Sequence, residues 1–287
     1  MKANTNRANR LAFDSVATSY DSSRPAMSDK VVSDLMTHAN LRSGSRVLEV
    51  GAGTGQLTIA LLDRGLQVTA LEPGDALRER LIEKTKGHNN VVVRPDLFEE
   101  YSNENNAFDA IVSANAWHWV DPSVGYSRAA NLLRPRGALG VIWNFPLLSD
   151  QMLRDRLNKE VFSGKGNWPD LAKGNDHFDS IQASALEGRK EIVESNLFSD
   201  PWWTFHEENF SLTIDMYIEF LKSYANVAIS SAERQIKLRE DVLKIVGNCE
   251  SIDLTNFVYI AVSHEEKRDI KLEIVSPEKP ARKHSSW

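Results

Sequence analysis

A chain of 287 residues can form one large domain, or a core domain that carries an insertion. Its formal net charge of −6 opposes non-specific attraction to nucleic acid. A composition of 41% hydrophobic and 26% charged residues excludes the collagen-like, disulfide-rich and disordered classes of protein. No apolar run approaches the roughly 20 residues of a bilayer crossing, and the N-terminus lacks a secretory h-region. With Cys249 as the only cysteine, we expect a cytoplasmic protein that binds neither nucleic acid nor membrane.

The first half of the chain alternates strand and helix patterns. Residues 1–30 form an N-terminal segment ahead of a core at 31–144. Within that core, strand patterns alternate with helices or loops and are found at 46–50, 68–71, 91–93, 108–113 and 138–143. Such alternation predicts βαβ units, and therefore a doubly wound α/β fold with a mostly parallel sheet.

The second half is less regular. Residues 145–230 indicate a helical insertion or cap after the fifth strand, with a returning strand near 202–210. We expect residues 231–263 to complete the core with a helix and a last strand, which brings the sheet to seven strands. The residues from 264 to 287 are predicted to be a polar tail.

A glycine-rich turn follows the first predicted strand. Gly51, Gly53 and Gly55 alternate with small residues, and the absence of Cβ atoms lets the backbone approach a ligand closely. The spacing is GxGxG, whereas the dinucleotide fingerprint is GxGxxG. Glu72 lies 21 residues beyond Gly51 at the end of the second strand, where a carboxylate can accept hydrogen bonds from both ribose hydroxyls and otherwise has only solvent as a partner.

Residues 49–55 (EVGAGTG) resemble motif I of the class I S-adenosylmethionine-dependent methyltransferases. Residues 108–113 (FDAIVS), 116–121 (AWHWVD) and 132–137 (LLRPRG) resemble the later motifs of the small-molecule branch that includes trans-aconitate methyltransferases. Residues 13–25 resemble the N-terminal segment of that branch.

This resemblance implies a cofactor, S-adenosyl-L-methionine, with its methionine end at the glycine loop, its ribose at Glu72 and its adenine at Asp96 and Leu97. It also implies that the N-terminal segment folds over the cofactor as a lid. The residues expected to bind the cofactor are Tyr20, Arg24, Gly51, Ala52, Gly53, Gly55, Gln56, Glu72, Pro73, Asp96, Leu97, Asn115, Ala116 and Trp117.

The implied reaction is methyl transfer to a small molecule, such as one of secondary metabolism, with a carboxylate or hydroxyl oxygen as the expected acceptor. The leaving group of this displacement is a neutral thioether and is already good. Positioning and exclusion of water therefore matter more than acid catalysis. His118 is the candidate catalytic base; alternatively it shapes the cofactor pocket between its tryptophan neighbours. Trp119, Trp143 and Tyr224 are expected to contact the substrate, although aromatic residues at helical spacing also suit a core.

Two other functions share these features. One is a methyltransferase-fold protein that binds S-adenosylmethionine but catalyses another reaction or serves as a binding module. The other is an NAD-dependent oxidoreductase, against which the GxGxG spacing and the tryptophan-rich segment argue. No metal-ligand spacing stands out, and His206 reads as isolated.

Overall fold

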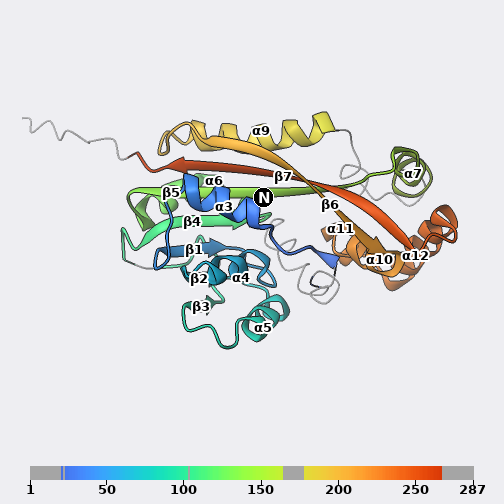
Figure 1. Ribbon diagram of the computed structural model, residues 1–287, viewed down its shortest axis with the longest axis horizontal. Helices are drawn as coiled ribbons and strands as arrows, with labels where there is room; N and C mark the ends of the chain where they lie inside the picture. Colours follow the sequence, from blue (N-terminus) through green and yellow to red (C-terminus); the bar gives the residue numbers. More distant parts are fainter. Residues whose placement is uncertain (1–20, 22, 103, 164–177, 267–287) are drawn as a thin grey trace, which may run out of the picture.

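A computed structural model describes residues 21, 23–102, 104–163 and 178–266, which contain a seven-stranded sheet (Figure 1). The strand order is β3-β2-β1-β4-β5-β7-β6. β1 to β5 pair in parallel, while β7 runs antiparallel to both β5 and β6, which confirms the doubly wound, mostly parallel α/β fold. The strands are β1 (Arg46–Val50), β2 (Gln67–Leu71), β3 (Val91–Arg94), β4 (Phe108–Ala114), β5 (Leu133–Leu148), β6 (Trp202–Thr213) and β7 (Ser251–His264).

Helices cover both faces of the sheet. α3 (Asp29–His38), α4 (Gln56–Asp63) and α5 (Asp75–Lys84) contribute buried leucines and valines to the core on one face. α6 (Pro122–Leu132) and α9 (Phe178–Glu194) close the core on the other face, together with the short helix η2 (Trp117–Trp119). The near-continuous apolar runs of the inner strands follow from this burial on both sides.

A third core lies at the far end of the long strands. β5, β6 and β7 continue past the rest of the sheet and end among a separate group of helices, which we call the cap (Figure 1). The helices of the cap are α7 (Gln151–Leu157), the π-helix η3 (Asn158–Phe162), α10 (Ile214–Lys222), α11 (Ala225–Ala228) and α12 (Ala232–Val246).

Two sequence-based expectations about the second half of the chain differ from the structure. The fifth strand was expected at 138–143, but antiparallel pairing with β7 from Ala138↔His264 to Leu148↔Leu254 extends it to Leu148. The helix α12 was expected to complete the core, but its buried face packs on α7 and α10 in the cap. Local periodicity could not reveal either result, because both depend on contacts between distant segments.

Some expectations fall outside the described residues, namely most of the lid segment, including Tyr20, and the tail beyond residue 266. None of the described helices is long and apolar enough to span a membrane. Within the described ranges, no group of three or more His, Cys, Asp or Glu side chains is arranged to hold a metal ion.

Candidate active site

The glycine loop joins β1 to α4 and lies against the residues that follow β4. The backbone N–H groups of Gly51 and Ala52 both donate to the carbonyl of Leu71, at 3.0 Å each. Gly51 has φ of 70°, and a Cβ on it would stand 2.3 Å from the Cβ of Ala116. Only glycine fits this position, so the fold brings the predicted residues Gly51 and Ala116 into contact.

Gly55 and Gln56 begin α4. A Cβ on Gly55 would stand 2.7 Å from Cδ1 of Leu81, so this glycine also lets α4 and α5 pack closely. Gln56 lines the cleft described below, and its Nε2 donates to Oγ1 of Thr54 at 2.8 Å. The sequence pattern did not reveal this helix-packing role of Gly55.

Glu72 follows β2, and only 6% of its surface is exposed. Its Oε2 accepts from the backbone N–H of Gly53 at 2.7 Å, and its Oε1 accepts from the N–H of Gly74 at 2.8 Å. The expectation that this carboxylate has only solvent as a partner apart from a ligand was therefore wrong. Because each carboxylate oxygen has further lone pairs, the group both fixes the glycine loop and can still accept hydroxyl donors. Pro73, the next residue, contributes its carbonyl to the guanidinium of Arg78 at 3.2 Å.

Glu49 is a site residue that the sequence analysis did not single out. It lies on β1, is 1% exposed, and borders the cleft beside Gly51. Its Oε2 accepts from Oγ1 of Thr58 at 2.6 Å. Burial raises the pKa of this carboxyl from 4.5 to about 8, an effect that the Thr58 hydrogen bond reduces and the charge of Glu72 reinforces. Glu49 is therefore mostly protonated at neutral pH. An acidic residue between apolar neighbours in a strand is the signal that could have identified it.

Three asparagines link β4, β5 and β7. Asn115, with φ of 56°, follows β4, and its Oδ1 accepts from the backbone N–H of Asn144 at 2.7 Å. Oδ1 of Asn144 in turn accepts from Nδ2 of Asn256 at 3.0 Å. Asn256 is 3% exposed, and its Oδ1 has no hydrogen-bond partner among the described residues. A buried amide oxygen without a partner is costly, so this atom marks a place for a donor group.

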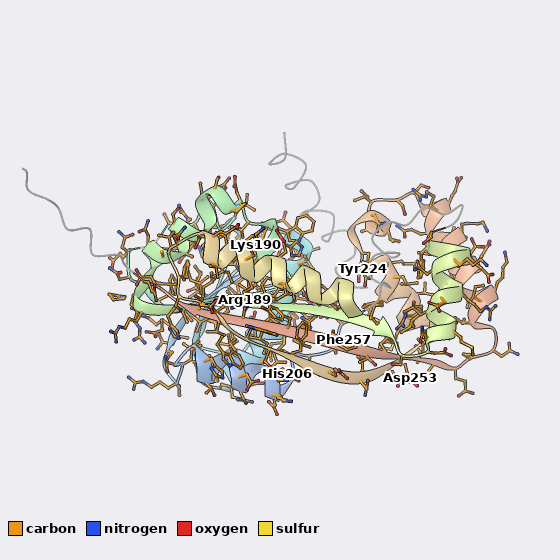
Figure 2. The ribbon with its side chains drawn as sticks, turned by 90° about the horizontal axis from the view of Figure 1, so that it is seen from above. Arg189, Lys190, His206, Tyr224, Asp253 and Phe257 are labelled. Carbon is orange, nitrogen blue, oxygen red and sulfur yellow. The ribbon has the colours of Figure 1, made fainter. Side chains whose placement is uncertain are left out.

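Arg24 joins the N-terminal segment to the cap. Its Nη2 donates to Oγ of Ser223 at 3.1 Å. Its guanidinium lies 4.6 Å from the ring centre of Phe220 and 5.4 Å from that of Tyr224, a cation–π arrangement. Figure 2 labels Tyr224 among the cap helices at the end of the long strands. Arg24 and Tyr224, predicted separately as cofactor and substrate contacts, thus lie side by side.

A cleft runs between the N-terminal segment and the carboxyl edge of the sheet. Residues 24–27 form one wall, and the glycine loop with Glu49, Gln56 and Leu57 forms a second. The remaining lining residues lie at or just beyond the end of β4 and on β5, β6 and β7; they are Ala114, Asn115, Asn144, Pro146, Glu208, Phe210 and Asn256. Ligands of open α/β sheets bind at this edge.

α3 is fixed to β6 next to the cleft. Three side chains at even-numbered positions of β6 pair with α3 and its N-cap: Trp202 stacks on His38 with ring centroids 3.4 Å apart, His206 lies 2.7 Å from Asp34 between Nε2 and Oδ2, and Glu208 accepts from the hydroxyl of Ser28. His206, which the sequence places apart from other potential metal ligands, is buried on β6 and pairs with Asp34 (Figure 2 labels His206).

The side chains of the tryptophan-rich segment after β4 lie in different environments. Trp117 is 4% exposed and packs in the core against Phe98 and Tyr126, with ring centroids 5.5 and 5.6 Å away. His118 retains solvent access and lies 4.8 Å from the Trp119 ring. Partial desolvation lowers the pKa of this exposed imidazole from 6.5 to about 4. The ring is therefore neutral at pH 7 and a weak base.

Other predicted residues lie away from the described cleft. Trp143 is buried, 5.3 Å from the ring of Tyr259, and Gly188 of α9 packs closely against it. Asp96 and Leu97 follow β3, and Asp96 pairs with Nε of Arg94 at 3.2 Å. Asp96 and Leu97 lie at the same sheet edge as Glu72, one strand further out.

Comparison with known proteins gives the family. Residues 48–141 match the family model described as a methyltransferase domain. The chain is 30% identical over 268 residues to a protein of Dictyostelium discoideum named as a methyltransferase, and the match covers 88% of this chain and 95% of that protein. An uncharacterized methyltransferase of Mycobacterium tuberculosis is 38% identical over 138 residues, which are 47% of this chain and 52% of the relative. The chain thus spans about half the length of that relative. It belongs to the methyltransferase family.

A solved structure supports the fold. One described as a methyltransferase from an antibiotic biosynthesis pathway of Anabaena variabilis aligns with a TM-score of 0.54 and 18% identity, over 83% of this chain and 98% of that one. The Rossmann-like architecture is therefore shared, with the strand order given above.

Proposed function

We propose that this protein transfers a methyl group from S-adenosyl-L-methionine to a small molecule in the cytoplasm. The observation that carries the proposal is the placement of the glycine loop, Glu72 and Asn115 at the ends of three adjacent strands, where the loop and Asn115 line one cleft and Glu72 is bonded to the loop. Family membership supports the reaction class, and the resemblance to the small-molecule branch with trans-aconitate methyltransferases supports a small acceptor.

The residues present fit the cofactor. Gly51 and Gly53 present backbone without a side chain at two positions of the loop, and Glu72 supplies a carboxylate suited to two ribose hydroxyls. Asp96 with Leu97 would hold the adenine, and Asn115 with Arg24 would border the methionine end. When bound, S-adenosylmethionine supplies an electrophilic methyl group on a sulfonium whose departure leaves a neutral thioether.

The chain's own contribution is positioning and exclusion of water. Residues 24–27 cover the cleft, and the contacts of Arg24 with the cap hold that wall in place. Fixing the reactants in line can contribute on the order of 7 kcal/mol, more than one proton transfer supplies. A carboxylate or hydroxyl oxygen is the acceptor expected from the resemblance.

His118 lies outside the lining of the described cleft, and in this proposal it helps to shape the cofactor pocket and does not remove a proton. Its lowered pKa, about 4, keeps the ring neutral, so that it can donate or accept a hydrogen bond. The same low pKa makes it a poor match for removing a proton from an alcohol or ammonium near pH 7.

Calorimetric titration of the purified protein with S-adenosylmethionine and, separately, with NAD tests the cofactor. We expect binding of the first and none of the second. Formation of S-adenosylhomocysteine in the presence of a small-molecule extract then tests transfer. Binding of NAD alone would overturn the proposal, and cofactor binding without turnover on any fraction would favour a binding module.

A further inference from the structure

The far wall of the cleft is built by two strands that lie beyond the cofactor-binding edge. Glu208 of β6 and Asn256 of β7 are direct partners in the antiparallel register, and Pro146 of β5 is the partner of Asn256 on its other side. Directly opposite residues point to the same face, with Cβ atoms about 5 Å apart. Glu208 and Asn256 therefore present their side chains together, and both line the cleft.

Both side chains offer acceptor atoms. Oδ1 of Asn256 is buried and has no partner among the described residues, while its Nδ2 is held by Asn144. Glu208 uses Oε1 to accept from the Ser28 hydroxyl, and its Oε2 makes no hydrogen bond within the described residues. A buried amide oxygen beside a carboxylate suits a group with several N–H donors and a positive charge.

Among the described residues that line the cleft, Arg24 is the one cation. It is already engaged by Ser223 and by two aromatic rings of the cap. Phe210, two residues beyond Glu208 on the same face of β6, adds an aromatic surface next to the acceptor pair. A carboxylate placed between Glu208 and Asn256 would meet two acceptor side chains, while the guanidinium of Arg24 is already held by Ser223 and two aromatic rings.

Distance separates this wall from the cofactor. In the sheet, β1 and β7 are three strand spacings apart, because β4 and β5 lie between them. At about 4.8 Å per spacing this is roughly 14 Å from the strand that carries the glycine loop. The ribose is assigned to Glu72, at the end of β2, and β2 lies on the other side of β1 from β7. β6 and β7 therefore border the part of the cleft that is left for the methyl acceptor.

We infer that the methyl acceptor carries a protonated amino group, which binds between Glu208 and the Oδ1 of Asn256. This inference rests on the proposed function and narrows it: a hydroxyl acceptor that also bears an amine fits, and an acceptor anchored here by a carboxylate does not.

The test uses three probes with the same skeleton, 3-phenylpropylamine, 3-phenylpropanol and 3-phenylpropanoate. Their dissociation constants are measured by ligand-observed NMR on the full chain saturated with S-adenosylhomocysteine. We expect the amine to bind at least about tenfold more tightly than the carboxylate, because one charge-assisted hydrogen bond contributes this much. Binding of S-adenosylmethionine itself is measured in parallel by calorimetry.

Glu208→Gln and Glu207→Gln form a matched pair. Each removes one negative charge, but Glu207 is exposed and points to the opposite face of β6. The amide oxygen that E208Q introduces can still accept from the Ser28 hydroxyl, so the contact with the α3 N-cap is kept. We expect E208Q to abolish the preference for the amine while the affinity for S-adenosylmethionine stays within about twofold, and E207Q to match the wild type.

Tighter binding of the carboxylate, or equal effects of the two variants, would overturn the inference and leave the proposed function intact. A tenfold loss of S-adenosylmethionine affinity in E208Q would also overturn it, because Glu208 would then belong to the cofactor site. Failure of the wild type to bind S-adenosylmethionine would instead refute the proposed function.

Discussion

Replacement of Glu49 by Gln changes how stability depends on pH. The carboxyl has its pKa raised from 4.5 to about 8 by burial, so the folded protein keeps its proton up to about pH 8 and the unfolded chain loses it above about pH 4.5. Between these values the folded state binds more protons. The free energy of unfolding contributed by this group therefore falls as pH rises through the window.

The magnitude follows from linkage. One proton bound in the folded state and not in the unfolded state gives a slope of up to about 1.4 kcal/mol per pH unit. The glutamine side chain in E49Q does not titrate, and its amide oxygen can still accept from Thr58. Relative to the wild type, E49Q should therefore gain roughly 3 kcal/mol between pH 5.5 and 7.5.

Urea unfolding at pH 5.5, 6.5 and 7.5 measures this difference in the free energy of unfolding. The control is Glu207→Gln, which removes an exposed carboxylate and should follow the wild type at each pH. Parallel pH profiles for E49Q and the wild type would refute the assignment of a protonated Glu49, and so would a gain that appears only below pH 4.5.

Further predictions concern the cofactor edge and the lid. Glu72→Gln should weaken S-adenosylmethionine binding about 10- to 100-fold by calorimetry, because one charge-assisted acceptor is lost; unchanged affinity would contradict the ribose role. Gly51→Ala should lower the free energy of unfolding by about 2–5 kcal/mol in urea, since its Cβ would overlap Ala116 and φ is positive. His118→Gln should change turnover less than tenfold, whereas a loss above about 100-fold would make it a base. Deletion of residues 1–25 should abolish turnover and leave the circular dichroism of the core; retained turnover would show that no lid is needed.

Much of the fold was predictable from local patterns. The strands β1 to β4 have short apolar runs flanked closely by glycine, proline, asparagine or charged residues, and the expected bounds differ from the observed ones by one residue at most. The ends of β5 and β7 were not predictable, because the segment at 144–148 contains Asn144 and Pro146 and becomes strand only through pairing with β7. Pro146 is tolerated there although proline lacks an N–H donor.

The carboxyl edge of the sheet, where we propose that the cofactor binds, was predictable for a related reason. Gly51 and Glu72 lie at strand ends, and parallel topology brings such ends to one edge whatever the details of packing. The aromatic residues were harder to place. Trp143 and Trp117 were expected to face ligands and are instead buried, because sequence does not show which face of a strand, or which side of a short helix, meets a covering helix.

The far wall of the cleft depends on register alone. Glu208 and Asn256 are 48 residues apart and become neighbours only because β6 and β7 pair in one particular alignment. A shift of one residue would turn Glu207 toward the cleft and Glu208 toward solvent, since successive side chains alternate between faces. The pairs between α3 and β6 oppose such a shift, because His206 and Glu208 would both lose their partners in α3 and its N-cap. The contacts that fix α3 thus also fix which glutamate faces the acceptor, and the comparison of E208Q with E207Q tests this register as directly as it tests the acceptor's charge.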